Sequence, residues 1–172
     1  MKAKNYREPK GQLYTRKEFI RGSPQPKINK FSMGDPNVKY NMRLSLIALE
    51  EAQIRHNSLE AGRVAANRVL QKKLGESFFF KVYPYPHIIL RENKMIFGAH
   101  ADRLQDGMRR SFGKPIGTAA RVRPNQPIMS AYVNEDAIEA AKEALKRGAA
   151  KLPIPCRITV ESLKMLEEGA QI

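Results

Sequence analysis

The stretch that decides the fold is IMSAYVNEDAIEAAKEALKRG, residues 128–148, in which a strand runs directly into a helix. Asn134 is placed to cap the helix, and Val133 and Ile138 occupy the two positions of a hydrophobic staple. Gly148 is a natural terminator, because glycine readily adopts the backbone conformation in which many helices end. The residues of the predicted buried stripe are Ile138, Ala141 and Leu145. This pattern predicts a helix that packs one apolar face against a sheet.

Another helix is predicted earlier in the chain, from Asn57 to Gly75. The Asn57 side chain can cap the first turn, and Glu60, three residues later, completes a capping box. The apolar face of this helix consists of Leu59, Gly62, Ala66, Val69 and Leu70. The cations on its other faces are Arg63, Arg68, Lys72 and Lys73. These cations either form a solvated face or touch phosphate.

The remaining apolar segments are short and β-prone. They are residues 27–33, 42–49, 78–83, 88–90, 118–123, 128–133 and 156–160. Short strands interrupted by two helices indicate an α+β fold with a mostly antiparallel sheet and both helices on one face. The chain of 172 residues suits a single α+β domain, residues 27–172, preceded by an arm, residues 1–26.

A long central loop, residues 99–117, interrupts the predicted strands. Its main part is ADRLQDGMRRSFGKPIG, residues 101–117, which contains three glycines, four cations and two acids. Loops of this length within a domain are usually functional or disordered. The composition suits a segment that reaches into a crowded anionic environment. Met108 and Phe112 are either buried within a folded loop or exposed as contact residues at its tip.

The N-terminal arm, residues 1–26, reads as an irregular basic segment. Its cations alternate with aromatic residues, and Gly22-Ser23-Pro24-Gln25-Pro26 breaks regular structure. Its apolar content is too thin for a core, so such an arm can remain disordered until it meets a partner. Basic groups interleaved with aromatic rings can bind phosphates and stack on bases. Alternatively, tyrosines such as Tyr6 and Tyr14 fix the arm to the domain.

The charge of the chain indicates a polyanionic partner. Lys and Arg number 31 against 17 Asp and Glu, a net charge of +14. Residues 1–47 carry a balance of +8 and residues 124–172 a balance of −1, which places the basic surface in the N-terminal half and the central loop. Nucleic acid is the first candidate, because phosphate neutralisation releases counterions. RNA is favoured over DNA, since neither predicted helix resembles a recognition helix.

Membrane binding is the rival interpretation of the charge, but its sequence features are missing. The sequence has no basic amphipathic helix with bulky anchors and no run of about 20 apolar residues. Cys156 is the single cysteine, which excludes an internal disulfide and fits a reducing, cytoplasmic location. A protein–protein adaptor using residues 124–172 is a further, weaker interpretation.

Catalytic motifs give little support for an enzyme. His56, His87 and His100 lack the spacing of a metal site, and the glycines of the central loop match no nucleotide-binding motif. An RNA-modifying or RNA-cleaving enzyme using His100, Asp102 and Asp106 is the alternative hypothesis. These residues lie in a loop, whereas a catalytic site needs rigid support. We therefore expect no enzyme activity, no cofactor, no metal and no small-molecule substrate.

The central loop also resembles a known family, the large-subunit ribosomal proteins called L16 in bacteria and L10e in archaea and eukaryotes. The segments that match the L10e branch are Ala101-Asp102-Arg103-Leu104-Gln105, Gly107-Met108-Arg109, Phe112-Gly113-Lys114-Pro115, Gly117 and Ala120-Arg121-Val122. Four further segments agree: Lys27-Ile28, Leu59-Glu60-Ala61, Ile128-Met129-Ser130 and Ala149-Ala150-Lys151-Leu152-Pro153. The resemblance covers nearly the whole chain.

The resemblance implies an α+β fold of the hammerhead type and a structural role in the large ribosomal subunit. It implies contacts with large-subunit ribosomal RNA and neighbouring ribosomal proteins, and a central loop that points towards the peptidyl transferase centre and the tRNA acceptor arm. The expected ribosomal RNA-binding residues are Lys2, Lys4, Arg7, Lys10, Arg16, Lys17, Arg21, Lys27, Lys30, Arg63 and Arg68. The expected tRNA-proximal residues are His100, Arg103, Met108, Arg109, Arg110, Phe112 and Lys114.

Overall fold

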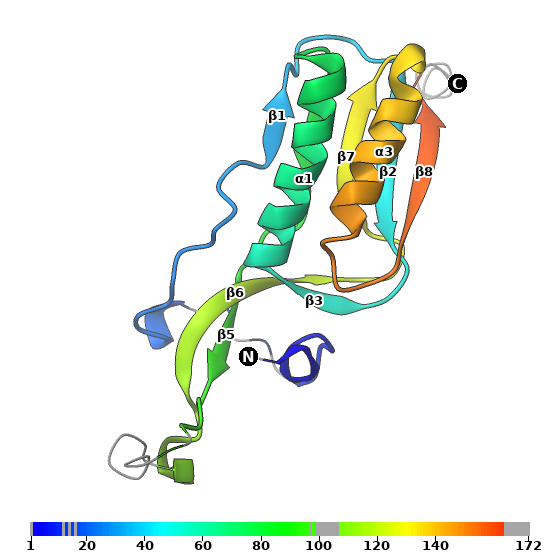
Figure 1. The fold of residues 1–172 in the computed structure, drawn as a ribbon. Coiled ribbons are helices and arrows are strands. Elements are labelled where there is room, and N and C mark those ends of the chain that lie inside the picture. The colour runs from blue at the N-terminus through cyan, green and yellow to red at the C-terminus, as the bar shows by residue number, and fades with distance from the viewer. Residues whose placement is uncertain are drawn as a thin grey trace, which may run out of the picture.

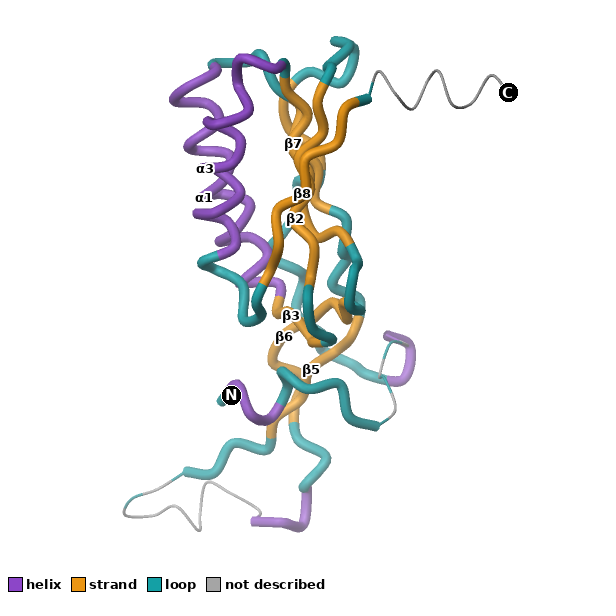
Figure 2. Tube along the Cα trace, turned by 90° about the vertical axis from the view of Figure 1, so that its right-hand side faces the viewer, coloured by secondary structure: helices purple, strands orange, loops and turns teal. Residues whose placement is uncertain are grey.

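Two helices cover one face of an antiparallel sheet in the computed structural model, and a β-hairpin extends from the end of this body (Figures 1 and 2). The structure describes residues 2–163 except 12, 14, 16, 97 and 99–106. For Lys17 and Arg110 the description covers the backbone alone. The predicted α+β class, with antiparallel strands and two helices on one face, is confirmed.

The larger sheet has five strands, and every neighbouring pair is antiparallel. Their order is β1 (Ser32–Gly34), β4 (Phe79–Val82), β7 (Pro127–Val133), β2 (Met42–Ala48) and β8 (Cys156–Ser162). Alternate residues of each strand face the helices, because successive side chains in a strand point to opposite sides. On β2, Leu44 and Leu46 are completely buried on the helix side. The core therefore lies between this sheet and the two helices.

A smaller sheet carries the hairpin. Its strands are β3 (Ala52–Arg55), β6 (Lys114–Val122) and β5 (Ile88–Glu92), in this antiparallel order. The sequence predicts no strand at β3, and it predicts β6 only from residue 118. Both differences arise from pairing: β3 pairs with the second half of β6, and the first residues of β6 pair with the end of β5. The single predicted sheet is therefore divided into two.

The helices α1 (His56–Leu74) and α3 (Ile138–Ala149) pack against each other through glycines. A Cβ atom added to Gly62 would lie 3.3 Å from the Gly148 carbonyl oxygen and 2.8 Å from Cε of Met129. Gly148 is therefore a packing residue inside α3, and its prediction as the terminator is wrong. Gly75 does end α1, with a φ of 61° and its N–H donating to the Gln71 carbonyl at 3.1 Å.

The predicted capping box of α1 is wrong. The helix begins at His56, Arg55 occupies the N-cap position, and no side chain caps the first turn. Asn57 lies inside the helix, while Glu60 accepts a hydrogen bond from Nε of Arg63 at 2.8 Å. The reason is that β3 runs directly into α1, so the strand sets the start of the helix.

The start of α3 also differs from the prediction. Asn134 precedes a short 3-10 turn, Glu135–Ala137, and its side chain makes no capping hydrogen bond. The α-helix itself begins at Ile138. The backbone carbonyl of Asn134 accepts a hydrogen bond from the Ala137 N–H at 3.0 Å, so a tight backbone turn satisfies the helix entry.

The first strand is shorter than predicted. Residues 27–31 are irregular, and only Ser32–Gly34 pair with β4. The Lys27 N–H donates to Nδ1 of His56 at 3.0 Å instead of joining a sheet. Ile28 is nevertheless buried in the core, which explains the apolar signal in this segment.

Candidate nucleic-acid interface

The hairpin of β5 and β6 forms a narrow support that carries the described part of the central loop, residues 107–113, away from the body (Figure 1). Its register pairs Ile88 with Ala119 near the body and Glu92 with Lys114 at the far end. Gly113 closes the far end with a φ of 73°. A Cβ atom there would lie 2.5 Å from the backbone carbon of Glu92, so only glycine fits this close approach.

Met108 and Phe112 are the most exposed large apolar side chains among the described residues of the central loop. Met108 has a relative exposure of 75% and Phe112 of 63%. The guanidinium carbon of Arg91 lies 3.0 Å from the centroid of the Phe112 ring, a cation–π contact. Of the two interpretations that the sequence leaves open for Met108 and Phe112, exposure is the one the structure supports. Apolar side chains held in solvent beside cations are typical of a contact surface.

The base of the loop is tied to the hairpin through a short 3-10 turn, Gly107–Arg110. The Asn93 side-chain amide donates to the Gly107 carbonyl at 3.1 Å, which fixes the start of this turn. Arg109 and Lys114 are exposed on either side of Phe112 in the sequence. From residue 107 to residue 116 the sequence contains three cations and no acid. Glu92 lies opposite Lys114 in the register but is outnumbered at this end by further cations, which are Arg91, Lys94 and Arg109. The described end of the hairpin is therefore a basic and aromatic surface.

Several predicted site residues lie outside the described residues. They are Arg16, His100, Asp102, Arg103 and Asp106, together with the side chains of Lys17 and Arg110. The alternative catalytic group, His100 with Asp102 and Asp106, is among them and stays a hypothesis from sequence. Among the residues that the structure does describe, no group of three or more His, Cys, Asp or Glu could hold a metal ion.

A buried histidine joins three segments at the body end of the hairpin. His56 accepts the Lys27 N–H at Nδ1, and a Cβ atom at Gly117 of β6 would lie 3.2 Å from its Nε2. Burial, followed by the charges of Arg55 and Lys27, lowers the pKa of His56 below its ordinary value of 6.5. The neutral ring with its proton on Nε2 fits these contacts. Sequence reasoning does not identify this residue, because nothing local signals its long-range contacts.

The N-terminal arm lies beside β3. The Gln53 N–H donates to the Arg7 carbonyl at 2.8 Å, and the Arg55 guanidinium lies 5.5 Å from the centroid of the Tyr6 ring. Arg7 also lies 3.7 Å from a carboxylate oxygen of Glu50. Tyr6 thus acts as an anchor of the arm, one of the two roles that the sequence leaves open.

A cleft of about 190 Å³ lies between the arm and the hairpin and is lined by residues of both. Its lining includes Asn5, Tyr6, Lys10, Gln53, Arg91 and Phe112. Two aromatic rings, two amides and two cations surround it, a combination that suits an unstacked base and its phosphate. This cleft joins the arm and the hairpin into one continuous candidate surface.

The predicted cations of the arm and of α1 are mostly exposed. The exposed ones are Lys2, Lys4, Arg7, Lys10, Arg21, Lys27, Lys30 and Arg68. Arg63 differs, because its side chain is only 14% exposed and its guanidinium is paired with Glu60. Glu60 raises the pKa of Arg63, so the charge is retained but already neutralised locally. A phosphate would have to compete with Glu60 for this guanidinium.

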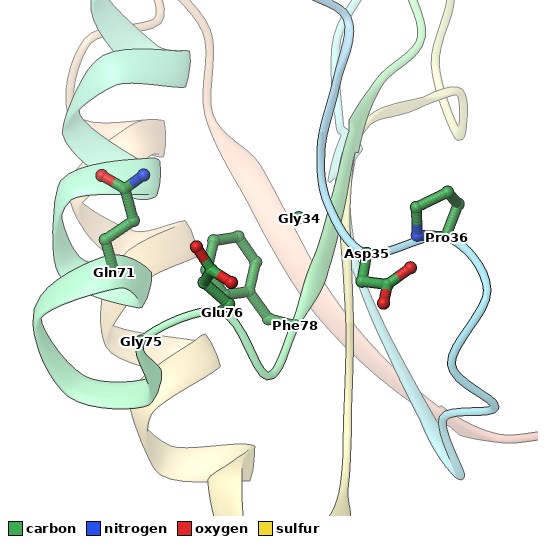
Figure 3. Close-up of a pocket in the computed structure, with 7 residues that line it drawn as sticks. All are labelled: Gly34, Asp35, Pro36, Gln71, Gly75, Glu76 and Phe78. Atoms are coloured by element: carbon green, nitrogen blue, oxygen red, sulfur yellow. The ribbon is translucent and has the colours of Figure 1, made fainter.

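A second cleft, of about 410 Å³, lies at the opposite end of the body, where α1 ends beside the turn after β1 (Figure 3). Its lining includes Asp35, Gln71, Glu76 and Phe78. The charged groups of the lining are the two carboxylates, and phosphate would be repelled there. This cleft is not part of the candidate interface. No helix in the described part of the chain is long and apolar enough to cross a membrane.

The chain is similar to known proteins along most of its length. Residues 9–159 match the family model described as "Ribosomal protein L16p/L10e". The "Large ribosomal subunit protein uL16" of Staphylothermus marinus is 53% identical over 163 residues, which cover 94% of this chain and 94% of that protein. The protein of the same name from Hyperthermus butylicus is 54% identical, over 90% of this chain and 86% of its own length. The one from Sulfolobus acidocaldarius is 53% identical, over 96% of both chains.

Proposed function

The chain belongs to the ribosomal protein L16p/L10e family, and from this premise we propose that it is a structural constituent of the large ribosomal subunit. In this role it binds large-subunit ribosomal RNA, sits among neighbouring ribosomal proteins in the cytoplasmic ribosome, and supports translation without catalysing a reaction. The relatives named above, which match along nearly their whole length, support the assignment.

The observation that carries the proposal is the exposed, basic end of the hairpin. Met108 and Phe112 project into solvent beside Arg109 and Lys114, and no acid interrupts residues 107–116. Exposed apolar and cationic side chains on an extended hairpin contribute little to the stability of the fold, so binding to a polyanionic partner accounts for their placement. Cations that contact phosphate position the protein without reading base sequence. Specificity then comes from the shape of the RNA.

The two ends of the candidate interface have different proposed partners. The arm and the first part of the body contact ribosomal RNA through their exposed cations. The central loop, residues 99–117, extends towards the peptidyl transferase centre and the tRNA acceptor arm. The hairpin supports this role because Gly113 and the Asn93–Gly107 hydrogen bond fix the direction in which the loop leaves the body.

The test is the salt dependence of RNA binding by the full chain. Wild-type protein should bind large-subunit ribosomal RNA with an affinity that falls steeply as salt rises, because binding releases counterions. The double variant Arg109→Ala/Lys114→Ala should reduce the slope of log affinity against log salt by about 1 to 2, the value expected for two lost phosphate contacts. The matched control is Lys142→Ala/Lys146→Ala, which removes two exposed cations from α3.

The salt slopes of the two variants decide between support for the proposal and its rejection. A reduced slope for the hairpin variant and an unchanged slope for the α3 variant would support the proposal. An affinity that does not respond to salt would contradict it. A second measurement is co-sedimentation with large ribosomal subunits, from which the wild-type protein should be released only by high salt.

A further inference from the structure

The face of the five-stranded sheet that points away from the helices carries aromatic and polar side chains. On β7, Met129 contacts the helix glycines, so Ser130 and Tyr132 lie on the opposite side. The strand register places Tyr132 beside Phe79 of β4 and Arg43 of β2. Figure 2 shows both helices on the other side of this sheet, and the described residues place no helix over this one.

Three rings on this face, Phe79, Tyr83 and Tyr132, form a connected group that we call the aromatic platform. The Phe79 and Tyr132 centroids lie 5.5 Å apart, and the Tyr83 and Tyr132 hydroxyl oxygens lie 3.2 Å apart. Beneath them, the Ser45 and Ser130 hydroxyls form a hydrogen bond of 2.8 Å and are almost completely buried. The rings are only half-buried, so part of their surface faces solvent over a fixed polar base.

Two cations, Arg43 and Lys81, contact the aromatic platform. The Arg43 guanidinium lies 5.9 Å from the Tyr132 ring centroid and donates to the Tyr83 hydroxyl at 3.3 Å, and Nζ of Lys81 lies 5.5 Å from the Tyr83 centroid. The described strand residues on this face carry three cations and one carboxylate. They are Arg43, Lys81, Arg157 and Glu161. The Glu161 carboxylate lies 3.6 Å from the Arg43 guanidinium, which leaves the other two, Lys81 and Arg157, as the cations offered to a phosphate. Burial, followed by the hydrogen bond that the Tyr132 hydroxyl shares with Tyr83, raises the pKa of Tyr132 to about 12, which keeps that hydroxyl neutral.

We propose that the aromatic platform is a second RNA-binding surface, on which unstacked bases of ribosomal RNA stack while Lys81 and Arg157 contact the adjoining phosphates. This rests on the proposed function, because RNA is the ligand in both cases. Exposed rings on a rigid sheet are a stacking surface for bases, which all have a π-face. Lys81, Glu161 and the two buried serines belong to the residue types that are depleted at the centre of a protein-docking surface, so this face fits RNA better.

The experiment uses the full chain and a 12-nucleotide single-stranded RNA that contains 2-aminopurine, with a duplex of the same length as the comparison. Stacking on the platform should quench the 2-aminopurine fluorescence. The double variant Phe79→Leu/Tyr132→Leu should weaken binding of the single strand by about tenfold and leave its salt dependence unchanged, since stacking is not a charge interaction. Tyr132→Phe, which keeps the ring, should bind as the wild type does.

A pair of charge reversals keeps the test decisive if the leucine variant fails to fold. Lys81→Glu and Lys142→Glu change the net charge equally, at exposed positions on the platform face and on α3. Lys81→Glu should weaken single-strand binding several-fold more than Lys142→Glu. Equal weakening by the two reversals, or unchanged binding by the leucine variant, would overturn the platform.

Failure of the platform and failure of the proposed function give different results. If only the platform is wrong, the wild type still binds ribosomal RNA in a salt-dependent way and Arg109→Ala/Lys114→Ala still reduces the slope. If the wild type binds no RNA in a salt-dependent way, both proposals are rejected.

Discussion

The body and the end of the hairpin use apolar residues in opposite ways. In the body, Leu44, Leu46 and Phe80 are completely buried between the sheet and the helices. At the end of the hairpin, Met108 and Phe112 are mostly exposed. Burial of an apolar side chain stabilises a fold by about 1.5–3 kcal/mol, and an exposed one forgoes this gain. The difference indicates that the body provides the stability and the hairpin provides the contacts.

The two regions also differ in how their charged side chains are paired. In the body, Glu143 pairs with both Lys73 and Arg147, at 2.5 and 2.7 Å. At the end of the hairpin, residues 107–116 contain cations and no acids. Exposed ion pairs contribute little to stability, but they neutralise a surface locally. Residues 107–116 therefore form a locally basic segment, whereas part of the charge on α1 and α3 is neutralised by Glu143.

The largest expected effect comes from the same substitution made in the two regions. Phe80→Ala should lower the free energy of unfolding by about 3–5 kcal/mol, because it leaves a cavity in the core. Phe112→Ala should lower it by about 1 kcal/mol or less, since the ring is largely in solvent. Denaturant unfolding of both variants measures the difference. Equal destabilisation would contradict the division between body and hairpin.

A smaller effect is expected from glycine substitutions at the hairpin end. Gly113→Ala combines a positive φ with a clash against the Glu92 backbone, which cannot move aside as a side chain could. We expect a loss of about 2–3 kcal/mol in stability, with weaker RNA binding. Gly107→Ala is the control, because its φ is 58° but nothing lies within 4 Å of the added Cβ.

The control should lose only about 1 kcal/mol, from backbone strain alone. Hydrogen exchange of the β5 and β6 amides, measured beside denaturant unfolding, shows whether the loss is confined to the hairpin. If Gly113→Ala and Gly107→Ala behave alike, the close approach at Glu92 does not fix the end of the hairpin.

The parts of the fold that were predicted correctly depend on local patterns. The buried face of α1, from Leu59 to Leu70, follows from a helical period that is visible in the sequence. Gly148 was misread because glycine serves both as a helix terminator and as a close-packing residue, and only its contact with Gly62 decides between them. The strand β3 was missed because its apolar–polar alternation lasts only four residues, Ala52–Arg55, before the chain enters α1, which is the shortest run that can indicate a strand.

The candidate site shows the same limit. Composition is enough to predict a basic central loop, but the exposure of Phe112 depends on how the hairpin holds it away from the core. The aromatic platform was not predicted either. Its rings come from β4, β7 and the residue after β4, and their meeting depends on a register between Phe79 and Tyr132, far apart in the chain. Burial and long-range pairing are properties of the whole fold, which local patterns do not report.

The smallest expected effect is a pH dependence that originates where the body meets the hairpin. The folded-state pKa of His56 is lowered, so as pH falls the unfolded chain takes up this proton first. Stability should therefore be full above pH 6.5, fall as pH drops below that value, and level off below the folded-state pKa. His56→Asn keeps an acceptor for the Lys27 N–H but cannot titrate. Unfolding measured from pH 7.5 to 5 should show a weaker pH dependence in this variant, and identical profiles would rule out His56 as the source.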